Sequence, residues 1–344
     1  MIRLPRLGRS TRIVLFVITV TVVLAITLHL GRLVLALDRN ASIDAVRVRN
    51  SMVAELGQPI DVDWSPNAVP EEFHWEQRPA PTRFVDVVKE VLRDAPADMT
   101  DFETALRLAR HLKASAREGQ PIQANAWLTY QKLTTGQGGY CSDFSRTMDA
   151  LALSAGLSVR EWGFTWESLA NGHAFNEIWE PSLHKWIFLD SFHGFYVVDK
   201  DSGTPLSVLE FRSHLMDGND PNTVRLVPIN GERFDEVRIN RERSYYARGM
   251  PRMFLLLGNN VFSHDAQPLI QMAEALPRSV EMLTAILLSQ QPRFLFVPPK
   301  NRPDLRKEVE DMVWIRNWTF FQIFLGAVSA VGAAFLLASL VSRR

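Results

Sequence analysis

The sequence predicts an α+β domain that lies between two transmembrane helices. Two apolar runs without a charged residue lie near the ends of the chain, at 13–31 and 318–341. Each is long enough to cross the hydrocarbon core of a bilayer, which takes about 20 helical residues. Between them, helical periodicity in residues 83–155 gives way to stretches rich in branched and aromatic residues in 159–190. Helices followed by strands in this order are typical of an α+β fold.

The first apolar run continues past Arg32 and predicts a transmembrane helix over residues 13–37. Four arginines without any acid precede it in the tail 1–12, namely Arg3, Arg6, Arg9 and Arg12. Such residues favour the cytoplasmic side of a membrane. A cleaved signal peptide is the alternative, but the run exceeds the apolar segment of a signal and no Ala-x-Ala site follows. We therefore expect a retained anchor with a cytoplasmic N-terminus.

The second run predicts a helix over residues 318–341 that ends in a short basic tail, 342–344. Two spans return both tails to the cytoplasm, so residues 38–317 are expected outside it. One feature opposes this orientation, because basic residues crowd the outer approach to the second span: Lys300, Arg302, Arg306, Lys307 and Arg316. The first span takes precedence, since it usually dominates orientation and long domains translocate despite their charges.

The residues between the spans divide into three parts. Proline and polar residues from 58 to 82 fall within an extended lead-in at 38–98, a core domain follows at 99–200, and an extension occupies 201–317. Hydrophobic periodicity predicts helices near 83–93, 101–116, 125–133 and 142–155, and strands at 159–165, 173–179 and 186–190. Three apolar segments of the extension are expected to be helices packed on the core or lying at the membrane surface: 245–262, 269–288 and 293–297.

Composition excludes several classes of function. The 38 basic side chains balance 38 acidic ones, which leaves no positive excess for wrapping nucleic acid. A single cysteine excludes an internal disulfide, a cysteine-rich zinc site and an iron–sulfur cluster, since each needs several sulfur atoms. The glycines at 136–139 lack the Gly-Lys-Ser/Thr of a phosphate-binding loop. We therefore predict no metal and no cofactor.

Three residues fit the chemistry of acyl transfer. Cys141 is expected at the N-terminus of the helix at 142–155, where free N–H groups and the helix dipole stabilise a thiolate. A two-residue hairpin loop at Pro181-Ser182 would place His173 directly opposite Asp190, so that the carboxylate can orient the imidazole. Each residue alone has an ordinary structural explanation, as a buried thiol, a strand histidine or a turn aspartate. Together they form a nucleophile, a base and an orienting acid.

Acyl transfer also needs hydrogen-bond donors for the oxyanion that forms in the transition state. The backbone N–H of Cys141 is the expected first donor. For the second we expect the side chain of Gln137 or of Gln131, which precede the cysteine.

Four segments around these residues resemble the sequence boxes of the transglutaminase-like superfamily. They are GGYCSDFS at 138–145, LSAGLSVR at 153–160, GHAFNEIW at 172–179 and WIFLDS at 186–191. The resemblance covers about residues 99–198 and implies a papain-like core, in which the helix that bears the nucleophile packs on an antiparallel sheet. It also implies that Cys141 is the nucleophile, His173 the base and Asp190 the orienter. The chain departs from the family pattern at Tyr140, before the cysteine, and at Phe175, where tryptophan is usual.

These features predict a bacterial inner-membrane protein whose periplasmic domain transfers or hydrolyses amide or peptide bonds of the cell envelope through a thioester. Arginine outnumbers lysine 31 to 7, which is typical of a GC-rich bacterial genome. The alternatives are a cysteine amidase or peptidase of envelope peptides, and a non-catalytic scaffold of an envelope or polysaccharide assembly complex. A stripe of small residues on the second span would fit the first span, a second copy or a membrane partner: Gly326, Ala330, Ala334 and Ala338.

Overall fold

The computed structural model describes residues 8–37, 42–55, 61–122, 124–166, 172–216, 221–299 and 302–341. The chain forms two compact units, a terminal unit of Met1–Met52 with Glu310–Arg344 and a central unit of Val53–Val309. Most of the predicted tail 1–12, the tail 342–344 and Lys300 lie outside the described residues.

The elements alternate along the chain much as the hydrophobic periodicity predicts. The helices are α1 Arg9–Leu37, α2 Ile43–Val53, α3 Thr82–Val91, α4 Asp101–Ser115, α5 Ala126–Thr134, α6 Cys141–Ser154, α7 Val208–Met216, α8 Glu236–Gly249, α9 Val261–Asp265, α10 Pro268–Ala273, α11 Arg278–Leu287 and α12 Pro303–Val341. The strands are β1 Ala54–Glu55, β2 Arg117–Glu118, β3 Gly138–Gly139, β4 Val159–Thr165, β5 Gly172–Glu180, β6 Lys185–Asp190, β7 Phe195–Asp199, β8 Val224–Pro228, β9 Met253–Leu256 and β10 Phe294–Phe296.

In the terminal unit, α1 and α12 are each long and apolar enough to cross a membrane. They run antiparallel, because Arg12 Nη1 donates to the carbonyl of Ser339 (3.1 Å), while Gly326, more than three turns before Ser339, meets Ile26. A Cβ atom at Gly326 would lie 3.4 Å from Ile26 Cγ2, so the small residue allows the close approach. The other members of the predicted stripe are exposed: Ala330, Ala334 and Ala338.

The central unit is built on an eight-stranded sheet with the strand order β1-β10-β9-β4-β5-β6-β7-β8. Every neighbouring pair is antiparallel except β1 with β10. The mixed helices and antiparallel sheet confirm the predicted α+β fold class. The sheet extends beyond the predicted core domain 99–200, since β1, β8, β9 and β10 lie outside that range. β9 and β10 fall in segments where helices were expected.

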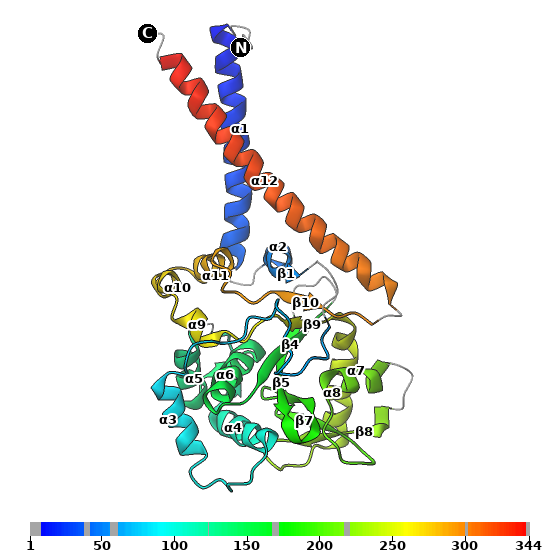
Figure 1. The fold of residues 1–344 in the computed structure, drawn as a ribbon. Helices are drawn as coiled ribbons and strands as arrows, with labels where there is room; N and C mark the ends of the chain where they lie inside the picture. The colour runs from blue at the N-terminus through cyan, green and yellow to red at the C-terminus, as the bar shows by residue number, and fades with distance from the viewer. Residues whose placement is uncertain are drawn as a thin grey trace. The chain divides into compact units, whose positions relative to one another are not determined.

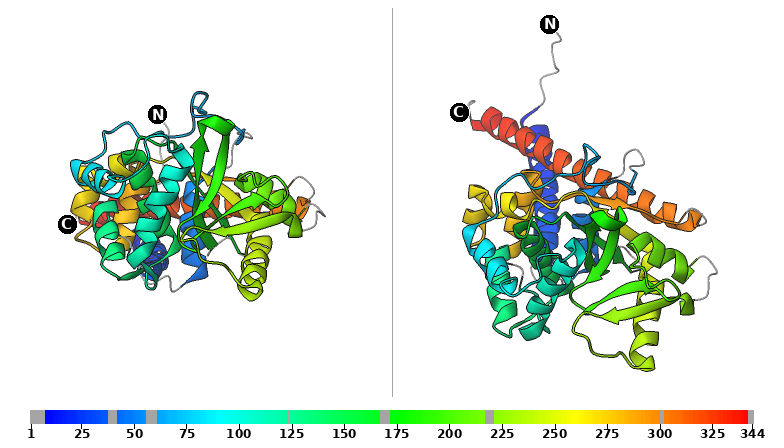
Figure 2. Two further views of the ribbon diagram at one scale, coloured as in Figure 1. Left: turned by 90° about the horizontal axis from the view of Figure 1, so that it is seen from below. Right: turned by 60° about the horizontal axis from the view of Figure 1, so that its bottom comes forward.

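Helices cover both faces of this sheet, as Figures 1 and 2 show. On one face, α3 to α6 bury apolar side chains against Val159, Ile178 and Leu189. On the other face, α7 and α8 pack on an aromatic layer that includes Phe175 and Phe188. The alternation of side chains along each strand supplies both layers, because successive residues point to opposite faces. The helix with Cys141 and the helix α8 therefore approach the sheet from opposite sides.

The hairpin of β5 and β6 differs from the prediction in its register. Glu180 pairs with Lys185 and Asn176 with Leu189, so the connection is 181–184, with a 3₁₀ turn, and not two residues long. His173 is therefore not directly opposite Asp190. The register is displaced by two residues, however, and side chains alternate with a period of two. Both residues consequently keep the same face of the sheet, one diagonal step apart.

Candidate active site

Helix α6 begins at Cys141, as the sequence predicts, and the thiol is partly exposed. Asp143 fixes this end of the helix, because its Oδ2 accepts from the backbone N–H of Tyr140 (2.8 Å) and of Ile122 (2.9 Å). The carboxylate thereby satisfies one backbone donor in the turn that carries the cysteine and one in the segment before α5. A negative charge in the first turn also complements the helix dipole.

The glycines before Cys141 serve close backbone packing. A Cβ atom at Gly138 would lie 2.5 Å from the Cα atom of Gly119, and strand β3 pairs in parallel with β2 at this point. A side chain at either position would push the two backbone segments apart. This packing holds the segment that leads into α6.

His173 and Asp190 meet although their register was mispredicted. His173 Nε2 lies 2.6 Å from Asp190 Oδ2, and the two side chains are 1% and 0% exposed. The thiol of Cys141 interacts with the same imidazole and contributes to raising its pKa. The structure thus brings the three predicted residues together.

The charges in this group are strongly coupled. Burial disfavours a charged imidazole, but the charge and hydrogen bond of Asp190, together with the thiol of Cys141, outweigh it and raise the pKa of His173 to about 10. Burial likewise opposes ionisation of Asp190, but the charges of His173 and His193 prevail and hold its pKa well below the usual range. At neutral pH the pair is therefore an imidazolium and a carboxylate.

Tyr246 completes the group from α8 and was not predicted. Its hydroxyl donates to Asp190 Oδ2 and lies 3.3 Å from His173 Nε2. Burial, and then the charge of Asp190, raise the pKa of Tyr246 well above its ordinary value, so the phenol stays protonated and remains a donor. The only signal in the sequence was that Tyr245-Tyr246 opens an apolar segment of the extension, which does not indicate contact with a strand far away.

His193 adds a second histidine beside the first. Its backbone N–H donates to Asp190 Oδ1 (2.8 Å), and its imidazole Nδ1 bonds to Glu242 Oε2. The rings of His173 and His193 are 4.8 Å apart. Asp190 therefore accepts on both oxygens, which fixes the orientation of the carboxylate beneath His173.

Donor atoms of His173, Asp190 and His193 lie within 4.8 Å of one another, a grouping that could hold a metal ion. Each imidazole, however, already bonds to a carboxylate, His173 to Asp190 and His193 to Glu242. These bonds engage one nitrogen of each imidazole, and two of the three residues belong to the Cys–His–Asp group.

The two glutamines expected near the oxyanion have different positions. Gln137 lies four residues before Cys141, in the turn that leads into β3, and Gln131 lies on α5; both are exposed. Within the described residues, neither side chain hydrogen-bonds with a member of the Cys–His–Asp group. Their assignment as oxyanion donors stays a prediction.

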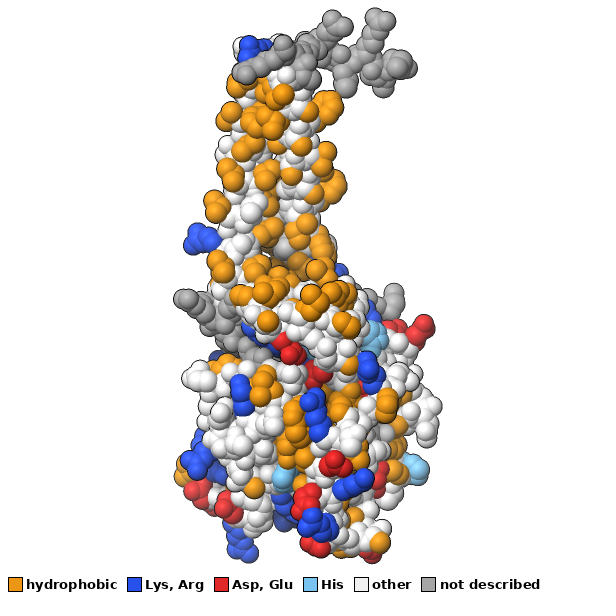
Figure 3. All heavy atoms as spheres, turned by 90° about the vertical axis from the view of Figure 1, so that its left-hand side faces the viewer, with side chains coloured by type: hydrophobic (Ala, Val, Ile, Leu, Met, Phe, Trp, Pro, Cys, Tyr) orange, Lys and Arg blue, Asp and Glu red, His pale blue; other side chains and the backbone are white. Residues whose placement is uncertain are grey.

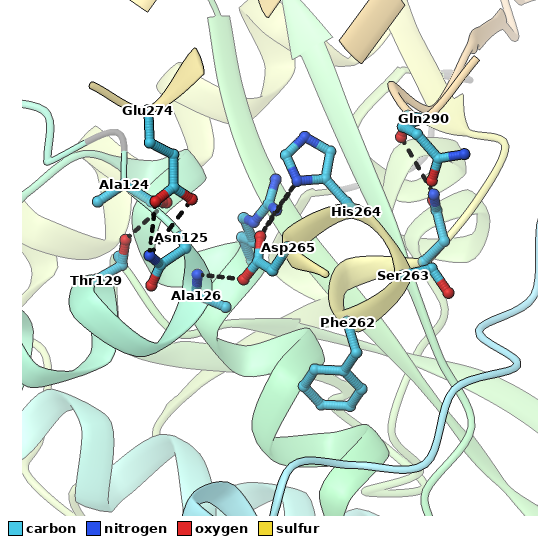
Figure 4. A network of polar contacts seen from close by, with 12 residues as sticks. Ala124, Asn125, Ala126, Thr129, Phe262, Ser263, His264, Asp265, Glu274 and Gln290 are labelled. Atoms are coloured by element: carbon cyan, nitrogen blue, oxygen red, sulfur yellow. Dashed lines mark hydrogen bonds and ion pairs between the residues drawn. The ribbon is translucent and has the colours of Figure 1, made fainter. Parts of the chain in front are cut away.

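A second polar network anchors the opposite side of α6. Arg146 Nη2 lies 2.6 Å from Asp265 Oδ1 and 2.8 Å from His264 Nδ1 on α9. The other oxygen of Asp265 accepts from the backbone N–H of Ala126 at the start of α5 (2.7 Å), as Figure 4 shows. Asp265 therefore joins the nucleophile helix to α5 and to the extension.

Asp149, on the same helix, is almost fully buried and accepts from Asn176 Nδ2 (2.8 Å). Burial raises its pKa well above the usual range and raises that of neighbouring Glu161 to about 7. A carboxyl group with a raised folded-state pKa stabilises the fold at low pH and costs stability as pH rises. An Asp149→Asn variant is therefore expected to melt above the wild type at pH 8, and by less at pH 5. Thermal unfolding of the full chain in detergent measures this, with exposed Asp201→Asn as control; an equal difference at both pH values would contradict it.

Comparison with known proteins agrees with this geometry. The family model described as the transglutaminase-like superfamily matches residues 87–191, a range that contains Cys141, His173 and Asp190. A search of curated proteins and a search of solved structures each gave no match. The matched range ends one residue after Asp190 and leaves out α8 with Tyr246. Residues 87–191 of the chain form a domain of the transglutaminase-like superfamily.

Proposed function

We propose that the protein is a membrane-anchored cysteine acyltransferase or hydrolase that acts on amide or peptide bonds of protein or peptide substrates in the cell envelope. The superfamily is one of cysteine-based acyltransferases and peptidases. The observation that carries the proposal is the buried His173–Asp190 pair, 2.6 Å apart, set against the thiol of Cys141 at the start of α6. A cysteine amidase or peptidase uses the same residues and differs only in the acceptor.

In the first half-reaction, the Cys141 thiolate attacks the carbonyl carbon of the substrate and the C=O electron pair moves to oxygen. The backbone N–H of Cys141 and the amide of Gln137 or Gln131 would bind this oxyanion. When the C=O bond reforms, the C–N bond breaks and the leaving amine takes the proton of His173. The products are a thioester on Cys141 and a neutral His173, with Asp190 still ionised.

In the second half-reaction, an amine or a water molecule attacks the thioester while His173 removes its proton. The C–S bond breaks, the new amide or acid leaves, and the thiolate–imidazolium pair is restored. Asp190 stabilises the imidazolium in both halves, and it is held by Tyr246 and by the backbone of His193. An amine acceptor gives transamidation and water gives deamidation or hydrolysis.

The proposed setting is the inner membrane of a bacterium, with both tails in the cytoplasm and the central unit in the periplasm. Two helices of sufficient length and apolar character support membrane anchoring. The arginine-rich tail before α1 supports the orientation. The exposed side of α12 with Ala330, Ala334 and Ala338 is available to a second copy or a membrane partner.

Alkylation of the full chain in detergent tests the proposed nucleophile. Because Cys141 is the only cysteine, all reaction with iodoacetamide belongs to it. We expect alkylation to stay fast below pH ~7 and to slow to the rate of an ordinary thiol, which reacts mainly above pH ~8, in His173→Ala. His74→Ala, at an exposed histidine, serves as control. Alkylation at the ordinary rate in the wild type, or no effect of His173→Ala, would contradict the assignment.

A further inference from the structure

Large apolar side chains are exposed together on α10 and α11. Leu269, Met272, Leu276 and Leu287 are 52%, 71%, 55% and 83% exposed, and we call these four the apolar face. Figure 3 views the side of the central unit on which α10 and α11 lie, where hydrophobic side chains gather. In the rest of the described central unit, the large exposed apolar residues are scattered over separate elements: Leu128, Tyr140, Leu183 and Val237. A contiguous exposed patch of this kind marks an interaction surface.

The topology places this face next to the points where the chain leaves the central unit. Helices α10 and α11 lie in the connection between β9 and β10. Strand β10 pairs in parallel with β1, at the edge of the sheet. β1 follows directly on α2 and the first apolar helix, and α12 begins at Pro303, shortly after β10 ends. Both connections to the apolar helices therefore leave from the sheet edge formed by β1 and β10, and the segment with α10 and α11 leads directly into β10.

Two basic side chains near the apolar face are each paired with a carboxylate. Arg278, at the start of α11, lies against Glu281, and Arg293 against Glu55. Glu274, at the end of α10, turns toward Asn125 of α5, with Nδ2–carboxylate distances of 3.3 and 3.4 Å (Figure 4). The two arginines beside the face are thus neutralised, and Glu274 adds an acidic group. The face suits a neutral lipid surface better than an acidic protein or an anionic headgroup.

We propose that α10 and α11 form a membrane-contact surface, whose apolar face lies at the boundary of headgroups and acyl chains in the leaflet nearest the central unit. The proposal rests on the membrane anchoring proposed above and names a further contact of the same chain. Monotopic helices bury such a face ~5–10 Å into a leaflet, with the polar side toward water. The two apolar helices would anchor the chain in the same membrane. Each side chain of the apolar face therefore needs to add only a small free energy of lipid binding.

Site-specific labels in the full chain test this contact. A cysteine-free Cys141→Ser background receives a single cysteine, by Met272→Cys or Leu287→Cys on the apolar face. Val237→Cys, on α8 and 79% exposed, is the matched control for an exposed apolar residue, and Val331→Cys, 72% exposed, reports on the α12 span. Each protein is labelled with an environment-sensitive fluorophore. It is then placed in nanodiscs of phosphatidylcholine, with or without phosphatidylcholine that carries a nitroxide on its acyl chain.

We expect the nitroxide to reduce fluorescence about twofold at positions 272, 287 and 331 and to leave position 237 unchanged, because only the first three lie within the lipid. The loss should not depend on salt, since the four side chains of the face are apolar. Quenching at 331 but not at 272 or 287 would overturn the membrane-contact surface while anchoring stands. A blue shift at 272 or 287 without quenching would point to protein contact and also overturn it. Absence of quenching at 331 as well would refute the anchoring itself.

Discussion

Replacement of Cys141 by alanine is expected to abolish amide-bond chemistry, with a loss of at least ~10⁴-fold, because no other group can form the thioester. The cysteine is partly exposed at the start of α6, so removal of one sulfur atom should leave the melting temperature nearly unchanged. The assays are ammonia release from glutamine peptides, incorporation of a labelled primary amine, and cleavage of envelope peptides. They also show which acceptor the site prefers.

Ser142→Ala is the matched control, since Ser142 is the exposed neighbour in the same turn and takes no part in the proposed chemistry. It should retain full activity in whichever assay the wild type satisfies. A Cys141→Ala protein that folds and still complements a deletion strain would reject the enzyme and favour the non-catalytic scaffold.

The Asp190→Asn variant is expected to lose stability as well as activity. Removal of one member of a buried ion pair costs about 3–5 kcal/mol, and loss of the orienting carboxylate of a catalytic triad lowers turnover by as much as ~10⁴-fold. Asn keeps the size of the side chain and can still accept from Tyr246, so the change isolates the charge. Chemical unfolding of the full chain in detergent and the peptide assays measure the two effects.

The stability effect should depend on pH with a definite sign. The folded-state pKa of His173, about 10, lies above its ordinary 6.5. The pair therefore contributes fully below pH 6.5, and the contribution is lost as pH rises through about 10. The depressed pKa of Asp190 requires that the carboxylate contribution fade in strong acid. The difference between wild type and Asp190→Asn should be largest near pH 5–6 and small at pH 10, whereas Asp201→Asn should show no such trend. A difference that is constant with pH would contradict the ion pair.

The sequence predicted that His173 and Asp190 meet, even though one step of the argument was wrong. The hairpin loop has four residues where two were expected, which displaces the register by two. An error of one residue would have sent His173 and Asp190 to opposite faces, but an error of two preserves the face. The length of the loop at 181–184 depends on its backbone conformation, which the proline alone does not determine. The sheet face of each side chain follows from the alternation of residues along a strand, and this alternation can be seen in the sequence.

Contacts between distant segments could not be predicted in this way. Tyr246 and Glu242 reach the site from α8 only because α8 packs on the aromatic face of the sheet. No periodicity in residues 236–249 indicates which strand will lie beneath them. The family match ends at residue 191 and therefore includes neither Tyr246 nor Glu242.

The positions on α12 that are partly covered differ from those that a spacing of four residues predicts. A helix turns 100° per residue, so positions four apart advance by about 40° each time, and Ala338 lies about 120° around the helix from Gly326. Contact with α1 instead alternates steps of three and four. Gly326, Ser329, Ala333 and Leu336 are partly covered, whereas Ala330 and Ala334 are exposed. Residues spaced strictly four apart therefore rotate away from the side of the helix that faces a straight neighbouring helix.

The origin of Tyr246 in α8 sets an order of events during synthesis. Cys141, His173 and Asp190 leave the ribosome well before residues 236–249, and until α8 docks, Asp190 lacks its phenol donor and the aromatic face lies bare. The nascent chain thus carries Cys141 and His173 while Asp190 is still incompletely held. Under the proposed function, assembly of the complete site awaits a helix that begins 46 residues after Asp190.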